Sequence, residues 1–199
     1  MTDLEKIANE INNCTLCDLH KNRTNAVPGE GPEDAKIMLI GEAPDYHEDQ
    51  QGRPFVGDAG DLLTKLLEEF ANLKRDEVFI GNVLKCRPPD NRDPNDEEIE
   101  KCSPYLKKQI LSIEPKLIVT LGRFATKLLL DRSVKISKEH GELEDGEYGG
   151  WNCKLFISYH PAAALYGADV GKKLENDFEK LGEIAKDLNS FKTTKQTTF

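Results

Sequence analysis

The stretch Leu39–Gly60, LIGEAPDYHEDQQGRPFVGDAG, joins an apolar segment to an acidic loop and then to the start of a helical pattern. The segment 36–42, which overlaps the start of this stretch, is short and almost continuously apolar, as in a strand that is buried on both faces. A loop that only packs between two elements does not need several carboxylates beside an aromatic residue, Phe55. The stretch therefore indicates a functional site at the end of a buried strand.

Strands and helices alternate on both sides of this stretch. Apolar segments predict further strands at 77–84, 116–122 and 154–160, and helical periodicity predicts helices at 2–11, 59–73, 97–113, 123–130 and 170–188. This pattern predicts an α/β fold, a three-layer αβα architecture around a central four-stranded, mostly parallel sheet. Ligands bind beyond the carboxyl ends of strands in such sheets, so the four loops that follow the strands should converge on one crevice.

Smaller features refine this prediction. Pro104 is expected to kink or divide the helix that starts at Asn95 or Asp96, because proline lacks the N–H that a helix interior uses. The segment 133–153 is expected to be irregular or to form a hairpin. Residues 1–189 are predicted to form a single domain, and 190–199, which carry no core pattern, a mobile tail.

The bulk composition limits the class of protein. The 199 residues suit one core, and no apolar run approaches the length of a membrane span. The N-terminus is acidic and amphipathic, unlike a signal peptide, which predicts a cytoplasmic protein. The net charge of −9 argues mildly against a nucleic-acid partner, although a local basic patch can exist within an acidic protein.

The five cysteines are not expected to form disulfides in a reducing compartment. Cys14 and Cys17 form a close pair, Cys86 follows the second strand, and Cys102 lies on the helix after a long loop. Four thiolates can hold zinc or an iron–sulfur cluster, and the wide spacing of the second pair suits the cluster better. Cys153, within an apolar strand, is expected to be an ordinary core residue.

Four motifs carry a resemblance to a known family. CTLCDLHKNRTNAVPGEG, GEAPDYHEDQQGRPFVGDAG, GNVLKCRPPDNRDPNDEEIEKCSPYL and HPAAAL occur in this order. They resemble the signature blocks of the iron–sulfur (family 4) uracil-DNA glycosylases, and the similarity runs from Cys14 to the last helix. The resemblance implies a [4Fe–4S] cluster on Cys14, Cys17, Cys86 and Cys102. It also implies hydrolysis of the N-glycosidic bond of deoxyuridine in DNA, which leaves an abasic site.

Such an enzyme must flip the nucleotide out of the duplex into a pocket. Phe55 resembles the family's stacking platform, and Asn82 its uracil reader, because an amide can accept from N3–H while donating to O4. His160 resembles the donor that stabilises the anionic leaving uracil at O2, a role that a neutral imidazole can perform. Gly41 and Ala43 are assigned to the same pocket. Structural readings remain open for Phe55 as a core residue, Asn82 as a turn residue and His160 as a loop histidine.

The sugar develops positive charge during bond cleavage and needs a water molecule and nearby negative charge. Glu42 and Glu48 are the candidates, and Glu48 is favoured over Asp49 because it matches the family position, although both can also be solvated loop charges. Ala43 stands where some related glycosylases carry a catalytic aspartate, so this chain needs a different carboxylate or a water held by the backbone. Asp58 is expected to be a solvated charge or a helix cap. Asp45 stands where the family usually has glycine, at the uracil edge where thymine carries its methyl group, so a narrowed pocket or altered substrate range is expected.

The expected partner is uracil-containing DNA, single- or double-stranded, bound by a monomer through four basic side chains in the converging loops: Arg53, Lys85, Arg87 and Arg92. Two alternatives remain. One is a non-catalytic or trapping uracil-DNA binding protein on the same fold, although the first motif lacks the basic, histidine-bearing insertion of trapping relatives. The other is a zinc-stabilised α/β ligand-binding protein, which the negative charge favours slightly.

Overall fold

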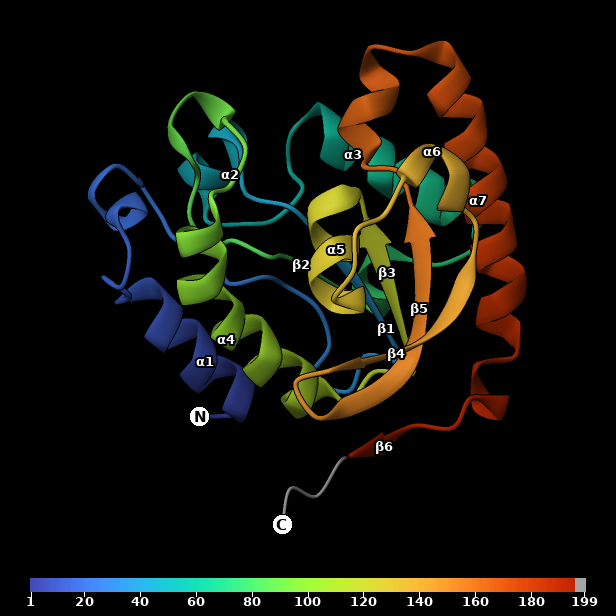
Figure 1. Cartoon of the computed structure of the whole chain (residues 1–199), viewed down its shortest axis with the longest axis horizontal. Coiled ribbons are helices and arrows are strands. Elements are labelled where there is room, and N and C mark those ends of the chain that lie inside the picture. Colours follow the sequence, from blue (N-terminus) through green and yellow to red (C-terminus); the bar gives the residue numbers. More distant parts are fainter. Residues whose placement is uncertain (196–199) are drawn as a thin grey trace.

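Four parallel strands form the centre of the sheet, as the sequence predicts. They are β1 (Ile37–Gly41), β2 (Phe79–Asn82), β3 (Leu117–Leu121) and β5 (Trp151–Ser158). The order across the sheet is β2-β1-β3-β5, with all three pairings parallel. The structure is a computed structural model that describes residues 1–195, and Figure 1 shows these strands between two layers of helices.

Two antiparallel strands extend this centre, so the sheet has six strands within residues 1–195. β4 (Leu143–Tyr148) forms a hairpin with β5, which decides between the irregular structure and the hairpin expected in this segment. β6 (Thr194–Lys195), within the segment 190–199 that is predicted to be a mobile tail, pairs with the start of β5. The side-chain amide of Asn152 donates to the Thr194 carbonyl over 3.3 Å, which holds the segment on the sheet. Residues 196–199 of the predicted tail lie outside the described residues.

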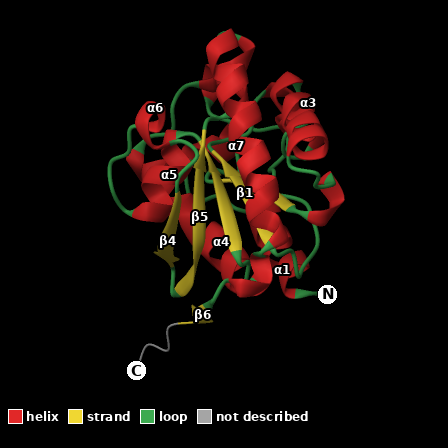
Figure 2. Ribbon diagram, turned by 90° about the vertical axis from the view of Figure 1, so that its right-hand side faces the viewer, coloured by secondary structure: helices red, strands yellow, loops and turns green. Residues whose placement is uncertain are grey.

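Helices cover both faces of the sheet (Figures 1 and 2). α4 (Asp96–Ile113) and α5 (Arg123–Leu130) pack on one face, and α3 (Asp58–Lys65) and α7 (Ala168–Lys186) on the other. Because side chains alternate along a strand, Met38 and Ile40 of β1 face the α4 layer, whereas Ile37 and Leu39 face the α7 layer. The core is therefore divided by the sheet, as in a three-layer αβα architecture.

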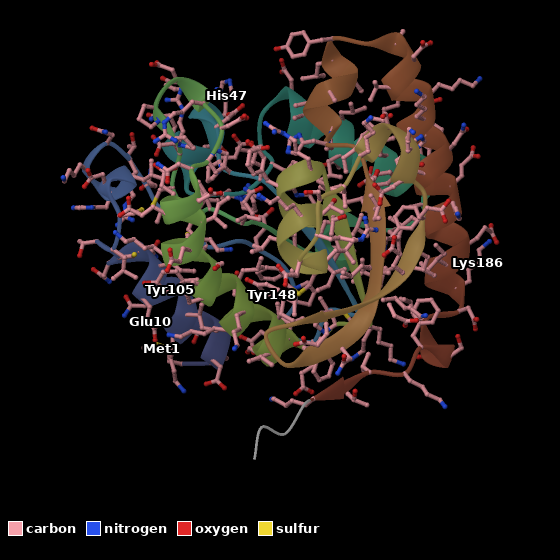
Figure 3. All side chains as sticks on the ribbon, viewed as in Figure 1. Met1, Glu10, His47, Tyr105, Tyr148 and Lys186 are labelled. Atoms are coloured by element: carbon pink, nitrogen blue, oxygen red, sulfur yellow. The ribbon has the colours of Figure 1, made fainter. Side chains whose placement is uncertain are left out.

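α1 (Asp3–Asn12) lies on the outside of α4 and not on the sheet. Ile7 and Ile11 are buried there and contact Tyr105 of α4, which Figure 3 labels between the two helices. Thr2 and Glu5 form a capping box at the start of this helix. The α1–α4 pair thereby brings the segment that follows α1 beside the N-terminal half of α4.

Three local features differ from the sequence-based expectation. The acidic loop contains a short helix, α2 (Tyr46–Gln51), because Asp45 and Glu48 form a capping box around its first turn. α4 is not divided at Pro104 and continues as one helix. The Ser103 hydroxyl donates to the Glu100 carbonyl over 3.4 Å, which supplies a partner for the oxygen that Pro104 cannot bond. The predicted helix 59–73 ends in a π-helical turn, Leu66–Phe70.

The carboxyl ends of the parallel strands lie at one end of the molecule. α2 follows β1 at this end, and Figure 3 labels its His47 there. A short 3-10 helix, Pro161–Leu165, follows β5, and the small helix α6 (Ile136–Glu139) precedes β4. Along the described residues, no helix is both long and apolar enough to cross a membrane.

Candidate functional site

A cavity of about 460 Å³ lies at the carboxyl ends of the strands. It is lined by Glu42, Ala43, Pro44, Asp45, Glu48, Phe55, Ala59, Asn82, Pro88, Asn91, Arg92, His160, Ala162 and Tyr166. The loops after β1, β2 and β5 therefore converge, as predicted from the strand order. The loop after β3 contacts the same region, because a Cβ added at Gly122 would lie 3.1 Å from the Cβ of His160.

Asn82 forms the floor of this pocket at the last position of β2. Its side chain is buried, and its Oδ1 is the one buried side-chain nitrogen or oxygen in residues 1–195 without a hydrogen-bond partner. Leaving a buried acceptor unpaired costs about 1–3 kcal/mol. A pocket that binds a ligand donor at this atom would recover that free energy.

Gly41 makes room for the Asn82 amide and for Phe55. A Cβ added at Gly41 would lie 2.4 Å from Asn82 Oδ1 and 2.7 Å from the tip of the Phe55 ring. No real Cβ atom tolerates such distances, so any other residue at this position would displace both side chains. The end of β1 therefore requires glycine for the shape of the pocket.

Phe55 and His160 form one wall. Their ring centroids are 5.5 Å apart, and the ring planes lie at 28°. Phe55 adopts φ +50°, an uncommon conformation for a non-glycine residue. The Arg75 guanidinium holds it by donating to the carbonyls of Phe55 over 2.9 Å and of Pro54 over 2.6 Å. Gly60 is also required, since a Cβ there would lie 2.0 Å from the Phe55 carbonyl oxygen.

His160 is neutral at physiological pH. Burial lowers the pKa of its imidazole to about 4, against a smaller opposing effect of the Asp45 carboxylate. Its Nδ1 lies 3.2 Å from the backbone N–H of Ala162 and accepts from it. The ring proton is therefore on Nε2, which makes His160 a neutral hydrogen-bond donor.

The two candidate carboxylates differ in what surrounds them. Glu48 Oε1 accepts from the backbone N–H of Val56 over 3.0 Å and of Gly57 over 3.4 Å, and its Oε2 accepts from the N–H of Asp45. Glu42 makes no such bonds within residues 1–195 and lines the pocket. Burial, and then the nearby Asp93 carboxylate, raise the pKa of Glu42 to about 7, while Arg123 opposes the shift.

Asp45 contributes its carboxylate to the start of α2. Its Oδ1 accepts from the N–H of His47 over 3.0 Å, and a hydrogen bond with Glu48 lowers its pKa. The residue also lines the pocket, so it occupies space at the rim. Asp58 is the first residue of α3, and its place in that first turn suits the helix dipole.

The basic residues predicted to contact DNA divide into two groups. Arg53, Arg87 and Arg92 are accessible, and Arg92 lines the pocket while pairing with Glu98 over 2.6 Å. Arg53 pairs with Glu30, and Arg87 lies over the Tyr46 ring. Lys85 is 1% exposed, so the prediction that it contacts DNA is wrong. The sequence pattern predicts a loop at Lys85, but its side chain points inward, where its Nζ donates to the Asn82 carbonyl and to Gln109 Oε1.

The four predicted cluster ligands come from three segments that meet beside α4. Cys14 and Cys17 follow α1, Cys86 follows β2, and Cys102 is on α4. Burial raises the pKa of Cys86, and the nearby Cys17 and Cys14 raise it further, so the thiols act on one another electrostatically. Among the described residues, no group of three or more histidines, cysteines or carboxylates is arranged to hold a metal ion. Cys153 is buried in the core from β5, as expected.

Two N–H groups point at these sulfur atoms. Arg23 donates to Cys86 Sγ over 3.1 Å, and the backbone N–H of Lys85 donates to Cys102 Sγ over 3.2 Å. Burial raises the pKa of Cys102 to about 12, so its thiol is neutral without a bound metal. In a cluster each thiolate binds its own iron, so four ligands need not converge on a single ion.

Sequence reasoning missed the residues that support the pocket. Arg75 and Glu30 are far from Phe55 in sequence, yet the Arg75–Glu30 pair at 2.8 Å anchors the Phe55 loop. No spacing or motif marks these residues as partners. Gly60 stands within the stretch Leu39–Gly60, but its contact with the Phe55 carbonyl depends on how the loop folds back.

The fold and site define an α/β protein with a pocket at the carboxyl ends of its parallel strands, in which an unpaired amide oxygen lies beside an aromatic wall. The model of the uracil DNA glycosylase superfamily matches residues 28–188. The chain belongs to this superfamily.

Within the superfamily, the chain is similar to type-4 and type-5 uracil-DNA glycosylases. The chain is 51% identical over 189 residues to a type-4 uracil-DNA glycosylase of Sulfurisphaera tokodaii. The matched region covers 93% of this chain and 86% of that relative. It is 47% identical to a type-4 uracil-DNA glycosylase of Archaeoglobus fulgidus, over 92% of this chain and 94% of the relative. A type-5 uracil-DNA glycosylase of Thermus thermophilus is 36% identical over 67% of this chain and 68% of its own length.

Proposed function

We propose that the protein is a uracil-DNA glycosylase that flips deoxyuridine out of DNA and hydrolyses its N-glycosidic bond, releasing uracil and leaving an abasic site. The observation that carries this proposal is the buried, unpaired Oδ1 of Asn82 at the floor of a pocket walled by Phe55 and His160. The family and the type-4 relatives support it.

The pocket residues have complementary roles in base recognition. Asn82 Oδ1 accepts from uracil N3–H, and its amide nitrogen donates to O4. Cytosine has no proton on N3, so the floor would place an acceptor against an acceptor and reject it. Phe55 stacks on the base. The Nε2–H of His160 donates to O2 as negative charge develops on the leaving ring.

Glu42 is the residue that we assign to the attacking water. Its carboxylate has no competing hydrogen bond within residues 1–195 and lies in the pocket. In its anionic form it orients the water and stabilises the positive charge on the sugar. Glu48 is a positioning residue, because its oxygens hold the Val56–Gly57 loop and the first turn of α2.

The cofactor belongs to the same proposal. Cys14, Cys17, Cys86 and Cys102 would hold a [4Fe–4S] cluster, and the donor set fits, because four cysteines gather with two N–H groups aimed at sulfur. The cluster would supply structural rigidity and no redox step. It would clamp both ends of the 86–102 segment, whose residues Asn91 and Arg92 reach the pocket.

Uracil-containing DNA is the proposed partner, bound by a cytoplasmic monomer. Arg87 and Arg92 lie on the 86–102 segment beside the pocket and can reach phosphates, while Arg53 lies beside Glu30 in a separate hollow. Leu165 ends the short helix after His160, and Tyr166, which is 93% exposed, caps it. Because the net charge of the protein is −9, the DNA contacts must come from local groups of basic residues.

The test is excision on a labelled oligonucleotide that carries one uracil, followed by alkali to cleave at abasic sites. Matched strands with thymine, hypoxanthine or cytosine measure the effect of Asp45 on substrate range. Cleavage at uracil and not at cytosine is expected. Tight binding of the uracil strand without cleavage, by protein with a full complement of iron, would replace the enzyme with a uracil-DNA binding protein.

A further inference from the structure

Lys85 is a buried cation that the proposed reaction does not use. Its side chain is 1% exposed, and its Nζ donates to the Asn82 carbonyl over 2.8 Å and to Gln109 Oε1 over 2.7 Å. Both acceptors are neutral, and within residues 1–195 no carboxylate forms an ion pair with this ammonium. Burying an ion is strongly unfavourable unless an opposite charge compensates for it, and among the described residues Cys102 is the one ionisable group that favours this ammonium. A methionine of similar shape would avoid this penalty, so stability alone does not explain the lysine.

The two ends of Lys85 connect separate parts of the site. Its ammonium bonds the main chain of Asn82, the residue whose Oδ1 is unpaired in the pocket. Its backbone N–H donates to Sγ of Cys102, one of the four proposed cluster ligands. Gln109 completes the link, since its Nε2 donates to the Pro28 carbonyl over 2.7 Å. Asn82, α4 and the 26–30 segment are thereby fixed relative to one another.

The Lys85 bond at the Asn82 carbonyl acts on the peptide that carries the Asn82 side chain. β2 ends at this residue, and its neighbours Val83 and Leu84 donate to carbonyls of Gly41 and Glu42. The Asn82 carbonyl therefore lies where the sheet ladder stops, and the lysine supplies its partner. A hydrogen bond from a charged donor is stronger than one between neutral groups, so it favours one orientation of this peptide.

We infer that Lys85 is a positioning residue for base recognition, in which the Nζ–Asn82 carbonyl bond holds the Asn82 amide in its reading orientation and the Lys85 N–H ties that orientation to Cys102. The inference rests on the proposed function and adds to it a residue that does not touch the base. It predicts that Lys85 acts on excision through Asn82 and through no independent route.

A double-mutant cycle tests this prediction on the full chain with its iron content measured. Lys85→Met is combined with Asn82→Ala, and single-turnover excision of uracil is measured for all four proteins. Lys85→Met alone is expected to slow excision by about 10- to 100-fold, as for a small misplacement of a reacting group. In the Asn82→Ala background the same change is expected to slow it less than about twofold.

Lys186→Met is the matched control. This lysine is exposed on the outer side of α7, where Figure 3 labels it, and it pairs with Glu183. It should leave excision and iron content unchanged. A second readout is the affinity for free uracil, which Lys85→Met should weaken by about fivefold or more while the melting temperature and visible absorbance stay at their wild-type values.

An equal slowing by Lys85→Met in both backgrounds would overturn the inference, because Lys85 would then act independently of Asn82. If Lys85→Met loses its iron or its fold, Lys85→Gln takes its place in the cycle, since its shorter, neutral side chain weakens the bond to the Asn82 carbonyl. Additive effects of Lys85→Gln and Asn82→Ala would equally overturn the inference. Absence of uracil excision by the wild-type protein would instead contradict the proposed function.

Discussion

The floor of the pocket and the framework behind it use polar groups in opposite ways. On the floor, Asn82 Oδ1 is buried without a partner, and Glu42 has a free carboxylate within residues 1–195. In the framework, Glu48 accepts three backbone hydrogen bonds, and Arg75 bonds Glu30, Pro54 and Phe55. Both regions contain an amide or a carboxylate beside the same aromatic ring.

This difference separates the groups that recognise a substrate from the groups that hold the pocket in shape. A native structure leaves a buried polar atom unpaired only where something compensates for it, and a bound ligand is such a compensation. A fully bonded polar group holds its neighbours in place and has no capacity left for a substrate. Residue type alone would assign Glu42 and Glu48 the same role, whereas their hydrogen bonds give them different ones.

The largest effect is expected on the floor. Asn82→Ala and His160→Ala should each lower the rate of uracil excision by about 10²–10³-fold, as removal of one donor from an oxyanion hole does. Asn82→Ala should leave the melting temperature nearly unchanged, because Asn82 Oδ1 supports no other residue, whereas His160→Ala should lower it, because the Ala162 N–H loses its acceptor. Single-turnover kinetics with thermal melts measure both. A large loss of melting temperature with normal excision would remove Asn82 from the recognition group.

The next largest effects are expected at Glu42 and Glu48, and the two effects differ in kind. Glu42→Gln should lower excision by about 10²-fold through loss of the general base, with little change in melting temperature. Glu48→Ala should destabilise the fold by about 1–3 kcal/mol, because buried N–H groups of the Phe55 loop lose their acceptor. Chemical denaturation beside the excision assay separates the two outcomes. A stable, inactive Glu48→Ala protein would reverse the assignment.

The pH dependence should reflect Glu42 and not His160. Since Glu42 acts as an anion with a pKa of about 7, excision should rise with pH through about 7, and Glu42→Gln should abolish that rise. His160, with a pKa of about 4, should add no inflection between about pH 5 and 8. The raised pKa also means that Glu42 favours the fold less as pH increases from 4.5 through about 7. A flat rate profile in the wild type would contradict the role of Glu42.

The smallest effect is expected at Arg53. Its exposed pair with Glu30 should contribute less than about 1 kcal/mol to stability. Both arginines pair with a glutamate, but Arg92 lines the pocket and Arg53 lies in a separate hollow, so Arg53→Ala should change DNA affinity less than Arg92→Ala does. The salt dependence of binding shows how many phosphates each variant neutralises. A larger loss of affinity at Arg53 would move the DNA path toward the Glu30 hollow.

The sequence predicted the elements better than the contacts between them. The four parallel strands and the helices around them follow from hydrophobic periodicity, and the pocket follows from the strand order. The inward turn of Lys85 did not, because a lysine in a polar loop is normally exposed. The Arg75–Phe55 contact and the pairing of Thr194–Lys195 with β5 depend on long-range packing, which no local pattern records.

The sequence predicted which residues form the candidate site, but not the role of each residue. Gly41, Phe55, Asn82 and His160 meet in one pocket, as the motifs imply. The separate roles of Glu42 and Glu48 could be assigned only from their hydrogen bonds, since both glutamates lie in the acidic stretch Leu39–Gly60. The tautomer of His160 likewise required its bond to the Ala162 N–H.

A crystal structure of the protein with uracil bound tests the central claim most directly. The account predicts that the ring stacks on Phe55, that N3 lies within hydrogen-bond distance of Asn82 Oδ1, and that O2 lies beside His160 Nε2. Uracil bound elsewhere, or an Asn82 Oδ1 that bonds a protein group while the base lies in the pocket, would contradict it.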